Sequence, residues 1–467
     1  MVKKNAVLLA AGDGKRMRSL RPKVLLEVLF EPMLEWTLSA CESSGIEEIC
    51  VVTGHASDEV EDYLQHREWA PDVRYVTVLQ SQRRGTGHAV MQAGDFLRQT
   101  GGDTLVLCGD APFLDKETID AAYEAHQNSG AAVTVISAVL EEPYGYGRIL
   151  RDENGALAAI VEERDATDEQ RAIREVNSGA YWCRTKTLPG LLDKLESGNA
   201  QGEYYFTDSV ALAIREGLGA SAFATDNSAV ALGANDRKGL FALHEFARLS
   251  IIERLLEEGV SFESLEGVQI GRHVRIGEDT VIRMGTVLRG KTIIGTGCVL
   301  GPNTWLQNCS VGYGCQLNSV QGFDSVLHAN VKAGPFVHIR PGSSIAKGVK
   351  IGDFVEVKNS SIGEGTAIAH LTYVGDSDVG SHVNFGCGVV TVNYDGANKH
   401  RTTIGDGAFI GCNTNLVAPV KVGNGAYTAA GTTVTRDVPD DALVIERGEE
   451  KIKEGFAKRK LKKKHGG

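Results

Sequence analysis

The spacing of apolar positions divides the chain into three parts. Residues 1 to about 226 carry short apolar, β-branched runs separated by segments with helical spacing. The runs are NAVLLA, EICVVTG, VRYVTVL, TLVLCGD and AAVTVISAVL, and the helical segments include PMLEWTLSACESSG and KETIDAAYEAHQNSG. Strands that alternate with helices predict an α/β domain with a mainly parallel sheet covered on both faces. Ligands in such sheets bind at the carboxyl ends of the strands.

The second part predicts one long amphipathic helix. Between Asn235 and about Gly259, apolar residues recur every three or four positions. Asn235 stands where a helix cap belongs and Gly259 where a helix stop belongs. This segment is interpreted as the connector between two domains. The apolar positions that define it are Leu240, Leu243, Phe246, Leu249, Ile252 and Leu256.

The third part repeats every six residues, a period that neither a helix nor a simple hairpin has. Hexapeptide repeats are typical of a parallel β-helix, in which each repeat forms one flat side and points its aliphatic residue inward. Glycines often follow the aliphatic residue, as short turns require. The repeating positions are Ile270, Ile276, Ile282, Leu288, Ile294, Leu300 and Leu306, then Ile339, Ile345, Ile351 and Val357, then Ile404, Ile410, Leu416, Val422, Thr428 and Val434.

Length and composition predict two or more domains and a cytosolic setting. The 467 residues exceed what one core comfortably serves. A net charge of −11 argues against nucleic acid as the main partner. The nine cysteines include no CxxC pair, which favours reduced thiols over disulfides or a zinc site. No apolar run is long enough for a signal peptide or a membrane span.

We therefore expect an α/β domain over residues 1–226, a linker helix over 227–259, a β-helix over 260–447, and an arm with a basic tail over 448–467. The tail ends in KRKLKKKHGG. A solvated end is favoured over contact with a membrane or with nucleic acid.

A first candidate site follows the first strand, in LLAAGDGKRM. Glycines let the backbone turn tightly and bring its N–H groups toward an anion, although a lone Gly-x-Gly is usually only a turn. Arg16 and Lys23 add cations just beyond the loop, and a glycine loop with two cations suits a triphosphate. Asp110 ends another strand, where a carboxylate could hold Mg²⁺ or simply cap a turn.

A second candidate site lies in the β-helix. Arg340 and Lys358 each follow an inward position and are eighteen residues apart. If three hexads make a turn, the two cations stack about 4.8 Å apart, and a phosphate between them would relieve their repulsion. The alternative is two solvated cations that splay apart. His370 and Tyr373 come next, and an imidazole there could accept a proton from an attacking amine at neutral pH.

The motifs LAAGDGKRM, RPK, QSQRRGTGHAV, CGD, YGYGRI, VEERDAT, EVNSG and GANDR occur in the order found in sugar-1-phosphate nucleotidyltransferases. Together with the hexapeptide repeats and HLTYVGDSDVGSHVNFGCGVVTVNYDGANKH, nearly the whole chain resembles one family. That family is the bifunctional N-acetylglucosamine-1-phosphate uridylyltransferase / glucosamine-1-phosphate acetyltransferases. The resemblance implies a Rossmann-like nucleotidyltransferase domain followed by a left-handed parallel β-helix, assembled as a cytoplasmic homotrimer.

The resemblance also implies the chemistry. Acetyl-CoA would acetylate glucosamine-1-phosphate in the β-helix, and UTP with Mg²⁺ would convert the product to UDP-N-acetylglucosamine and pyrophosphate, for cell-envelope synthesis. At the nucleotide site it implies charge stabilisation by Arg16, contacts to the nucleotide, its phosphates and the sugar, and two metal ligands. The contact residues are Leu9, Ala10, Ala11, Gly12, Lys23, Gln80, Gly85, Thr86, Cys108, Gly109, Gly147, Glu162 and Asn177, and the metal ligands are Asp110 and Asn235.

In the β-helix the resemblance implies that His370 is the general base. Arg340, Lys358, Tyr373 and Asn384 would bind the sugar phosphate. The acetyl-CoA site would consist of Cys387, Asn393, Tyr394, Cys412, Ala430 and Arg447.

Four residues depart from the family pattern. Cys108 replaces a tyrosine that usually precedes Gly-Asp, which removes a ring contact to the nucleotide. Asp13 adds a negative charge to the anion loop and would repel phosphate unless it points outward. Cys387 and Cys412 stand where alanine and serine are common, so acetyl transfer could become sensitive to alkylation.

Two other interpretations remain open from the sequence. One keeps only nucleotidyl transfer and treats the β-helix as architecture, which His370, Tyr373 and the Asn393–Tyr394 pair argue against. The other treats the β-helix as an oligomerisation scaffold without catalytic activity.

Overall fold

The computed structural model of the chain describes residues 2–199 and 201–459. From residue 460 onward, the basic tail discussed above lies outside this range. The chain divides into two compact units, Met1–Ala247 and Arg248–Gly467. In the described part of the chain, no helix combines the length and the apolar character needed to cross a membrane.

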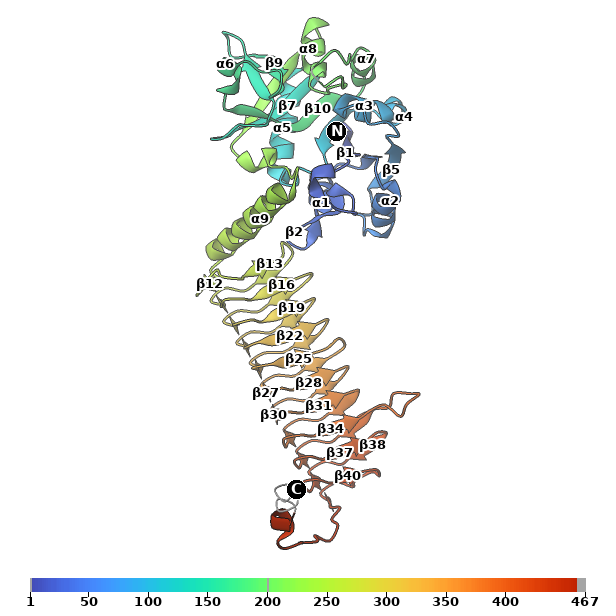
Figure 1. Ribbon diagram of the computed structural model, residues 1–467, viewed down its shortest axis with the longest axis vertical. Helices are drawn as coiled ribbons and strands as arrows, with labels where there is room; N and C mark the ends of the chain where they lie inside the picture. The colour runs from blue at the N-terminus through green and yellow to red at the C-terminus, as the bar shows by residue number, and fades with distance from the viewer. Residues whose placement is uncertain (1, 200, 460–467) are drawn as a thin grey trace. The chain divides into compact units, whose positions relative to one another are not determined.

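The first unit is built on a mixed sheet with strand order β11-β7-β10-β6-β1-β4-β5, to which β8 and β9 attach through β10 (Figure 1). Its strands are β1 (Lys4–Ala10), β4 (Glu48–Thr53), β5 (Arg74–Leu79), β6 (Asp103–Cys108), β7 (Val133–Val139), β8 (Arg148–Arg151), β9 (Leu157–Val161), β10 (Glu175–Arg184) and β11 (Ala220–Thr225), and a small ribbon pairs β2 (Glu27–Val28) with β3 (Glu31–Pro32). Its helices are α1 (Met33–Ser43), α2 (Ser57–His66), α3 (Thr86–Gln92), α4 (Gly94–Gln99), α5 (Lys116–Ser129), α6 (Asp168–Arg171), α7 (Leu188–Leu192) and α8 (Asp208–Arg215), with 3₁₀ turns η1 (Lys15–Met17), η2 (Lys23–Leu25) and η3 (Ser228–Ala231).

The five predicted apolar runs all form strands, and β6, β1, β4 and β5 are parallel to their neighbours in this order. Successive residues of β1 enter two different cores: Val7 packs in one, and Ala6 and Leu8 pack in the other. Burial on both faces explains why these strands read as unbroken apolar runs. Strand β10, which runs antiparallel to β6 and β7, was not predicted, because a register shift between Asn177 and Ala180 interrupts its apolar pattern.

The predicted long helix is α9 (Arg237–Glu257). The expectation that Asn235 caps this helix is wrong. The Asp236 carboxylate accepts a hydrogen bond from the N–H of Gly239 at 2.8 Å and therefore has the capping role. Asn235 turns its side chain to Lys23 instead.

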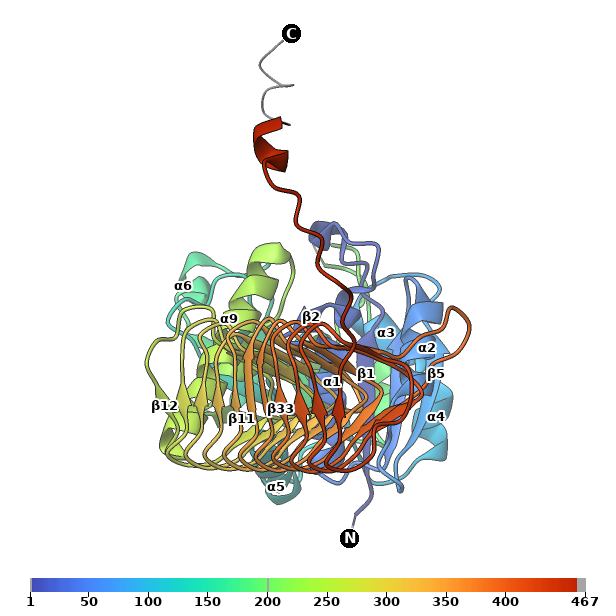
Figure 2. The ribbon, with the colours of Figure 1, turned by 90° about the horizontal axis from the view of Figure 1, so that it is seen from below.

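In its described part, the second unit is a left-handed parallel β-helix with three sides (Figures 1 and 2). Each strand from β12 to β37 pairs with the strand three places later, and β39 pairs with β41. The first side contains β12 (Ser261–Phe262), β15 (Val281–Ile282), β18 (Val299–Leu300), β21 (Gln316–Leu317), β24 (Lys332–Ala333), β27 (Lys350–Asp353), β30 (Ala367–His370), β33 (Asn384–Phe385), β36 (Phe409–Ile410), β39 (Tyr427–Thr428) and β41 (Leu443–Val444).

The second side contains β13 (Gln269–Ile270), β16 (Val287–Arg289), β19 (Trp305–Gln307), β22 (Val320–Phe323), β25 (Val337–Ile339), β28 (Glu356–Lys358), β31 (Tyr373–Gly375), β34 (Val390–Val392), β37 (Asn415–Val417) and β40 (Thr433–Val434). The third side contains β14 (Arg275–Ile276), β17 (Ile293–Ile294), β20 (Ser310–Val311), β23 (Val326–Leu327), β26 (Ser344–Ile345), β29 (Ser361–Ile362), β32 (Ser377–Val379), β35 (Thr402–Ile404) and β38 (Val420–Val422).

The six-residue pattern is confirmed, since every predicted inward residue from Ile270 to Val434 is at most 7% exposed. Coil lengths nevertheless vary. Ile282 pairs with Leu300 in strict register, whereas Phe385 pairs with Ile410 across a longer step that contains an extruded loop. The pairing holds because each coil hydrogen-bonds to the next at the spacing of adjacent strands, about 4.8 Å.

Substitutions at two adjacent residues of β17, one facing inward and one facing outward, test the packing of the interior. Ile294 is 2% exposed and Ile293 is 49% exposed. We expect Ile294→Ala to lower the free energy of unfolding of the β-helix by about 2–5 kcal/mol, because it leaves a cavity in the stack. Ile293→Ala is the matched control and should cost about 0.5–1 kcal/mol. Denaturant titration with amide hydrogen exchange of β-helix residues measures both effects, and equal losses would contradict the inward assignment.

Candidate active sites

The first site is a cavity of about 310 Å³ at the carboxyl ends of β1 and β6. These strands are neighbours, and the N–H of Gly109 donates to the carbonyl of Leu9 at 2.9 Å, so the glycine loop and Asp110 lie side by side. The lining contains nine of the predicted residues, together with five others. The predicted residues are Leu9, Ala11, Gly12, Lys23, Gln80, Gly85, Thr86, Cys108 and Asp110, and the others are Asp13, Val24, Arg83, Ala89 and Glu203.

Lys23 joins the two predicted metal ligands. Its side chain is only 9% exposed, and its ammonium group donates to the Asp110 carboxylate in a short ion pair and to the Asn235 amide oxygen at 3.0 Å. Two oxygen atoms from distant parts of the sequence, Asp110 and Asn235, thus converge on one positive charge. A carboxylate and an amide oxygen are also donors that Mg²⁺ accepts when phosphates and water complete its shell.

The extra charge of Asp13 is neutralised inside the pocket. Its carboxylate forms a close ion pair with the Arg83 guanidinium and a longer one with Lys15 at 3.5 Å. The expected repulsion of phosphate is therefore offset by a cation that the motif analysis did not single out. Because Asp13 and Arg83 are distant in sequence, only the fold reveals that they meet.

The remaining lining residues hold one another in place. The Gln80 amide donates to the carbonyl of Gly85 at 3.2 Å, and the hydroxyl of Thr86 accepts from the N–H of Phe206 at 3.1 Å. Gly85 has a φ of 102°, and an added Cβ would lie 2.5 Å from the carbonyl oxygen of Tyr204. This turn therefore requires glycine.

A second group of predicted residues gathers beside β8, β9 and β10. The N–H of Asn177 donates to the carbonyl of Gly147 at 2.9 Å, and a Cβ added to Gly147 would lie 3.5 Å from Glu162 Oε2. At the bulge of β10, a Cβ added to Gly179 would lie 3.4 Å from the Cys108 sulfur. The predicted sugar-binding residues thus lie next to the cavity at the ends of β1 and β6.

Burial shapes the protonation of this region. Burial, reinforced by the negative charge of Asp110, raises the pKa of Cys108 to about 12, so this thiol stays neutral. Burial also raises the pKa of Glu162, with Asp165 and Asp208 adding to the effect against a hydrogen bond from Thr207. The Thr207 hydroxyl donates to Glu162 at 3.3 Å. Thr207 was missed by sequence analysis because a single threonine in a loop carries no recognisable signal.

Other predicted residues lie apart from the pocket lining. Arg16 is exposed on η1, Ala10 is buried as the last residue of β1, and Gly109 follows β6.

In the β-helix, Arg340 and Lys358 are neighbours on the second side. Ile339 pairs with Val357, and the N–H of Arg340 donates to the carbonyl of Val357 at 2.8 Å. Both cations already have carboxylate partners, however. The guanidinium of Arg340 contacts Glu356 at 2.8 Å, and the ammonium group of Lys358 contacts Asp376 at 3.2 Å. Their mutual repulsion is therefore relieved without an added phosphate.

Asp376 organises this cluster. Burial acts to raise the pKa of Asp376, but hydrogen bonds from Asn359, Asn393 and Lys358 outweigh it and hold the pKa below its usual value. The Asn393 amide also donates to the Tyr373 hydroxyl at 3.5 Å. The structure thus places Asn393 with the predicted sugar-phosphate residues, and sequence analysis overlooked Glu356 and Asp376.

His370 begins a column of predicted acetyl-CoA residues at the corner between the first and second sides. Ile368 pairs with Phe385, which pairs with Ile410, and Ile410 pairs with Thr428. Two residues further along each strand, the same register aligns His370, Cys387, Cys412 and Ala430. The Arg447 guanidinium donates to the carbonyl of Ala430 and closes the column at its far end.

Two predicted residues stand away from these groups. Asn384 is exposed on the first side, whereas Arg340, Lys358 and Tyr373 belong to the second side. Tyr394 is 57% exposed at the base of an extruded loop. The Asp395 carboxylate ties this loop together by accepting from the N–H groups of Ala397 and Asn398 and contacting His400 at 2.8 Å.

Comparisons with known proteins agree with this geometry. The nucleotidyl transferase family model matches residues 5–232, and the bacterial transferase hexapeptide (six repeats) model matches residues 273–308 and 401–436. The fold and the two sites thus define a nucleotidyltransferase joined to a hexapeptide-repeat transferase.

Relatives named bifunctional protein GlmU match along the full length. The one from Geobacillus sp. (strain WCH70) is 44% identical over 466 residues, which is 100% of both chains. Those from Thermoanaerobacter pseudethanolicus and Caldanaerobacter subterraneus subsp. tengcongensis are 46% and 45% identical, over 98% of both chains in each case. The chain belongs to the GlmU family of bifunctional proteins. It is an N-acetylglucosamine-1-phosphate uridylyltransferase and a glucosamine-1-phosphate acetyltransferase.

The cysteines give a test of the second site. Cys412 is exposed, and Cys387 and Cys108 are both half-buried, but the raised pKa of Cys108, about 12, keeps its thiol protonated. We expect iodoacetamide to modify Cys412 and Cys387 first, and to abolish most acetyl transfer while uridylyl transfer persists, because the adducts fill the column beside His370.

Peptide mass spectrometry and separate assays of the two activities measure this outcome. The variant Cys387→Ala/Cys412→Ser is the control and should keep acetyl transfer after treatment. Full acetyl transfer in the wild-type chain with both thiols alkylated would show that they lie off the reaction path.

Proposed function

We propose that acetyl transfer takes place beside His370 and that uridylyl transfer takes place in the pocket at the ends of β1 and β6. The observation that carries the first assignment is the column of His370, Cys387, Cys412 and Ala430. A basic side chain therefore begins a continuous path of small residues along the coil stack. We assign residues 1–226 to uridylyl transfer, 227–259 to a linker, 260–447 to acetyl transfer, and 448–467 to a C-terminal arm.

In the acetyl-transfer site, the amine of glucosamine-1-phosphate attacks the thioester carbonyl of acetyl-CoA. His370 accepts the proton that the amine loses, and coenzyme A leaves as the thiol. The sugar phosphate is held by Arg340, Lys358, Tyr373 and Asn384. Its phosphate replaces the carboxylates of Glu356 and Asp376 as the partner of the two cations. Acetyl-CoA lies along Cys387, Cys412 and Ala430, with contacts from Asn393, Tyr394 and Arg447.

In the uridylyl-transfer site, the phosphate of N-acetylglucosamine-1-phosphate attacks the α-phosphorus of UTP in line, and pyrophosphate leaves. This reaction needs positioning and charge stabilisation but no protein nucleophile. Leu9 to Gly12 and Lys23 contact the nucleotide, and Gln80, Gly85 and Thr86 contact the base. Gly147, Glu162 and Asn177 hold the sugar, and Arg16 reaches the phosphates by moving from its exposed position.

We infer that Asp110 and Asn235 hold Mg²⁺. Their oxygen atoms converge on the ammonium group of Lys23, so the protein already gathers them around a positive charge. Within the described residues, no group of three or more histidine, cysteine or acidic side chains is arranged to hold a metal. A site with two protein oxygens suits Mg²⁺ that is completed by substrate phosphates and water. The bound ion would neutralise charge that develops on the phosphates.

We infer that the working assembly is a homotrimer in which neighbouring chains share the acetyl-transfer site. Asn384 and Tyr373 lie on different sides of one chain, so a single sugar phosphate can contact both only if two chains combine. The corner between these sides carries an exposed apolar ridge of Phe336, Phe354 and Leu371, each about 60% exposed and in the left-handed backbone region. Bulky residues in that conformation are strained, and a partner surface would repay the cost.

We also place the enzyme in the cytosol. All nine cysteines are free in the structure, which suits reducing conditions.

The two sites should fail independently. We expect Asp110→Ala to lower uridylyl transfer about a hundredfold or more, because it removes a metal ligand, and to spare acetyl transfer. We expect His370→Ala to lower acetyl transfer about 10²–10⁴-fold and to spare uridylyl transfer.

Removal of Mg²⁺ with a chelator should abolish only uridylyl transfer. Separate coupled assays measure each step, and simultaneous loss in a folded variant would contradict the separation of sites.

The apolar ridge gives a test of assembly. We expect Phe336→Ser/Phe354→Ser to shift the trimer toward monomers and to reduce acetyl transfer more than uridylyl transfer, as measured by sedimentation velocity and the two assays. Tyr313→Ser is the control, since Tyr313 is 55% exposed at a different corner. An unchanged trimer in the double variant would place the interface elsewhere.

A further inference from the structure

A trough of small residues runs along the outer face of the first side. Each residue of its floor directly follows an inward-facing residue of the first side, and the coil register aligns them. The floor consists of Gly301, Asn318, Gly334, Gly352, Ala369, Gly386, Gly411 and Ala429. A Cβ added to Gly334 or Gly352 would lie 1.8 Å or 2.0 Å from a carbonyl oxygen of an adjacent coil, so glycine is required at both positions.

His370 divides the trough into two halves with different rims. Toward the C-terminus, Asn384 is the first residue of the rim, and the positions in register with it are apolar: the stacked rings of Phe409 and Tyr427 and then Leu443. That half runs beside the column of Cys387, Cys412 and Ala430, which we proposed as the acetyl-CoA site. Toward the N-terminus, the half between Arg283 and His370 forms a cavity of about 610 Å³. His370 lines its C-terminal end, and the roles described above use none of its other lining residues.

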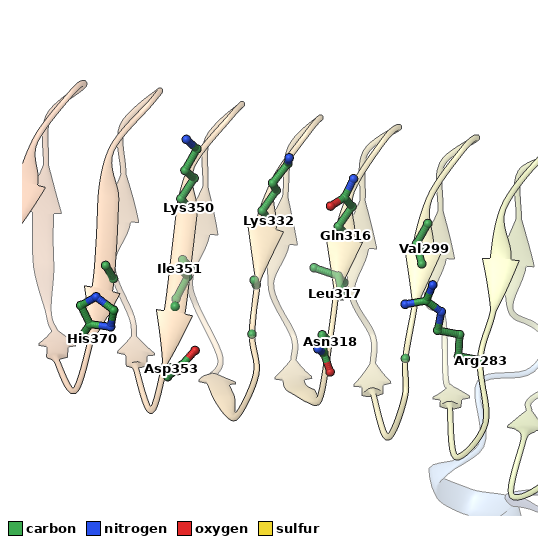
Figure 3. Close-up of a pocket in the computed structure, with 15 residues that line it drawn as sticks. Arg283, Val299, Gln316, Leu317, Asn318, Lys332, Lys350, Ile351, Asp353 and His370 are labelled. Atoms are coloured by element: carbon green, nitrogen blue, oxygen red, sulfur yellow. The ribbon is translucent and has the colours of Figure 1, made fainter.

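The N-terminal half has a basic edge. Lys332 and Lys350 are paired in register on adjacent coils, so their backbones are about 4.8 Å apart. Figure 3 shows both lysines extending along one edge of the cavity together with Gln316, while Asp353 and His370 lie on the opposite edge. Among the ion pairs of the described residues, none involves Lys332 or Lys350, whereas Arg283 at the far end is paired with Glu263.

This charge arrangement differs from that of Arg340 and Lys358. There, each cation contacts a carboxylate of its own chain. At Lys332 and Lys350, two ammonium groups face the same cavity without such a partner, and a bound anion would relieve their repulsion. The cavity also extends over six strands from β15 to β30, about 24 Å at the spacing of adjacent strands, which is much longer than one phosphate. Its volume is that of a typical small-molecule site.

We propose that the N-terminal half of the trough binds a diphosphate, with one phosphoryl group on Lys332 and the other on Lys350, and with any organic part extending toward His370. Each ammonium group then meets one phosphoryl group. The uridylyl-transfer reaction releases two molecules with this chemistry, pyrophosphate and the nucleotide sugar. The longer of them would reach His370 and obstruct the acceptor of acetyl transfer, so the site would give feedback from the second reaction on the first.

Chemical footprinting tests binding directly. Lysines of the full-length chain are acylated with an N-hydroxysuccinimide ester, without Mg²⁺, in the presence of pyrophosphate or UDP-N-acetylglucosamine, and modification is quantified by peptide mass spectrometry. We expect each probe to slow acylation of Lys332 and Lys350 about tenfold and to leave Lys347 unaffected. Lys347 is exposed on the neighbouring turn, outside the cavity lining, and is the internal control. Equal or absent protection of the three lysines would overturn the proposal.

Inhibition kinetics test the consequence. UDP-N-acetylglucosamine should inhibit acetyl transfer in the wild-type chain, and Lys332→Gln/Lys350→Gln should raise the inhibitory concentration about tenfold with unchanged uninhibited activity. Lys347→Gln carries the control substitution and should behave as wild type. Pyrophosphate should inhibit less than the nucleotide sugar, because it does not reach His370. Inhibition that persists unchanged in the double variant would contradict feedback through this site. That outcome is distinct from a failure of the His370 assignment, which would show in the His370→Ala assay.

Discussion

The coil-to-coil hydrogen bonding of the β-helix is the constraint on which its chemistry depends. The inward-facing residues anchor each coil in the packed interior, and backbone hydrogen bonds hold the next coil at the spacing of adjacent strands. Side chains two positions after the inward residue therefore stand in a column, as His370, Cys387 and Cys412 do. Side chains that are distant in sequence therefore become neighbours because of the coil register, which is set by the inward-facing residues and not by the aligned side chains themselves. The rigid packed interior keeps their separations uniform.

In the cavity at the ends of β1 and β6, the main structural feature is the concentration of charged side chains. Parallel strands end at one edge of the sheet, so β1 and β6 bring the glycine loop against Asp110. Lys23, held between Asp110 and Asn235, keeps this edge preorganised in the absence of substrate. The Asp13–Arg83 pair does the same at another wall of the cavity. The cations of both pairs are thus already held at the pocket wall, so their charge is preorganised.

Much of the fold could be predicted because it follows from short-range periodicity. Ile294 was assigned inward from its spacing alone, and the apolar strands of the first sheet are unbroken because both faces are buried. Strand β10 was missed because its bulge breaks the apolar pattern. Contacts such as Asp13–Arg83, Glu162–Thr207 and Lys358–Asp376 depend on how distant segments meet. Asn384 comes eleven residues after Tyr373, which is about two hexads, so a three-sided coil places them on different sides, and the grouping of both residues by motif alone did not take this into account.

The loop extruded after Asn393 has an implication for how such enzymes diversify. Phe385 and Ile410 still pair across it, so the extra residues leave the stack without disturbing the coils above and below. A solenoid whose repeats contact only their neighbours tolerates such insertions at small energetic cost. Evolution can therefore exchange, lengthen or delete this loop while the stack of coils on either side is inherited unchanged.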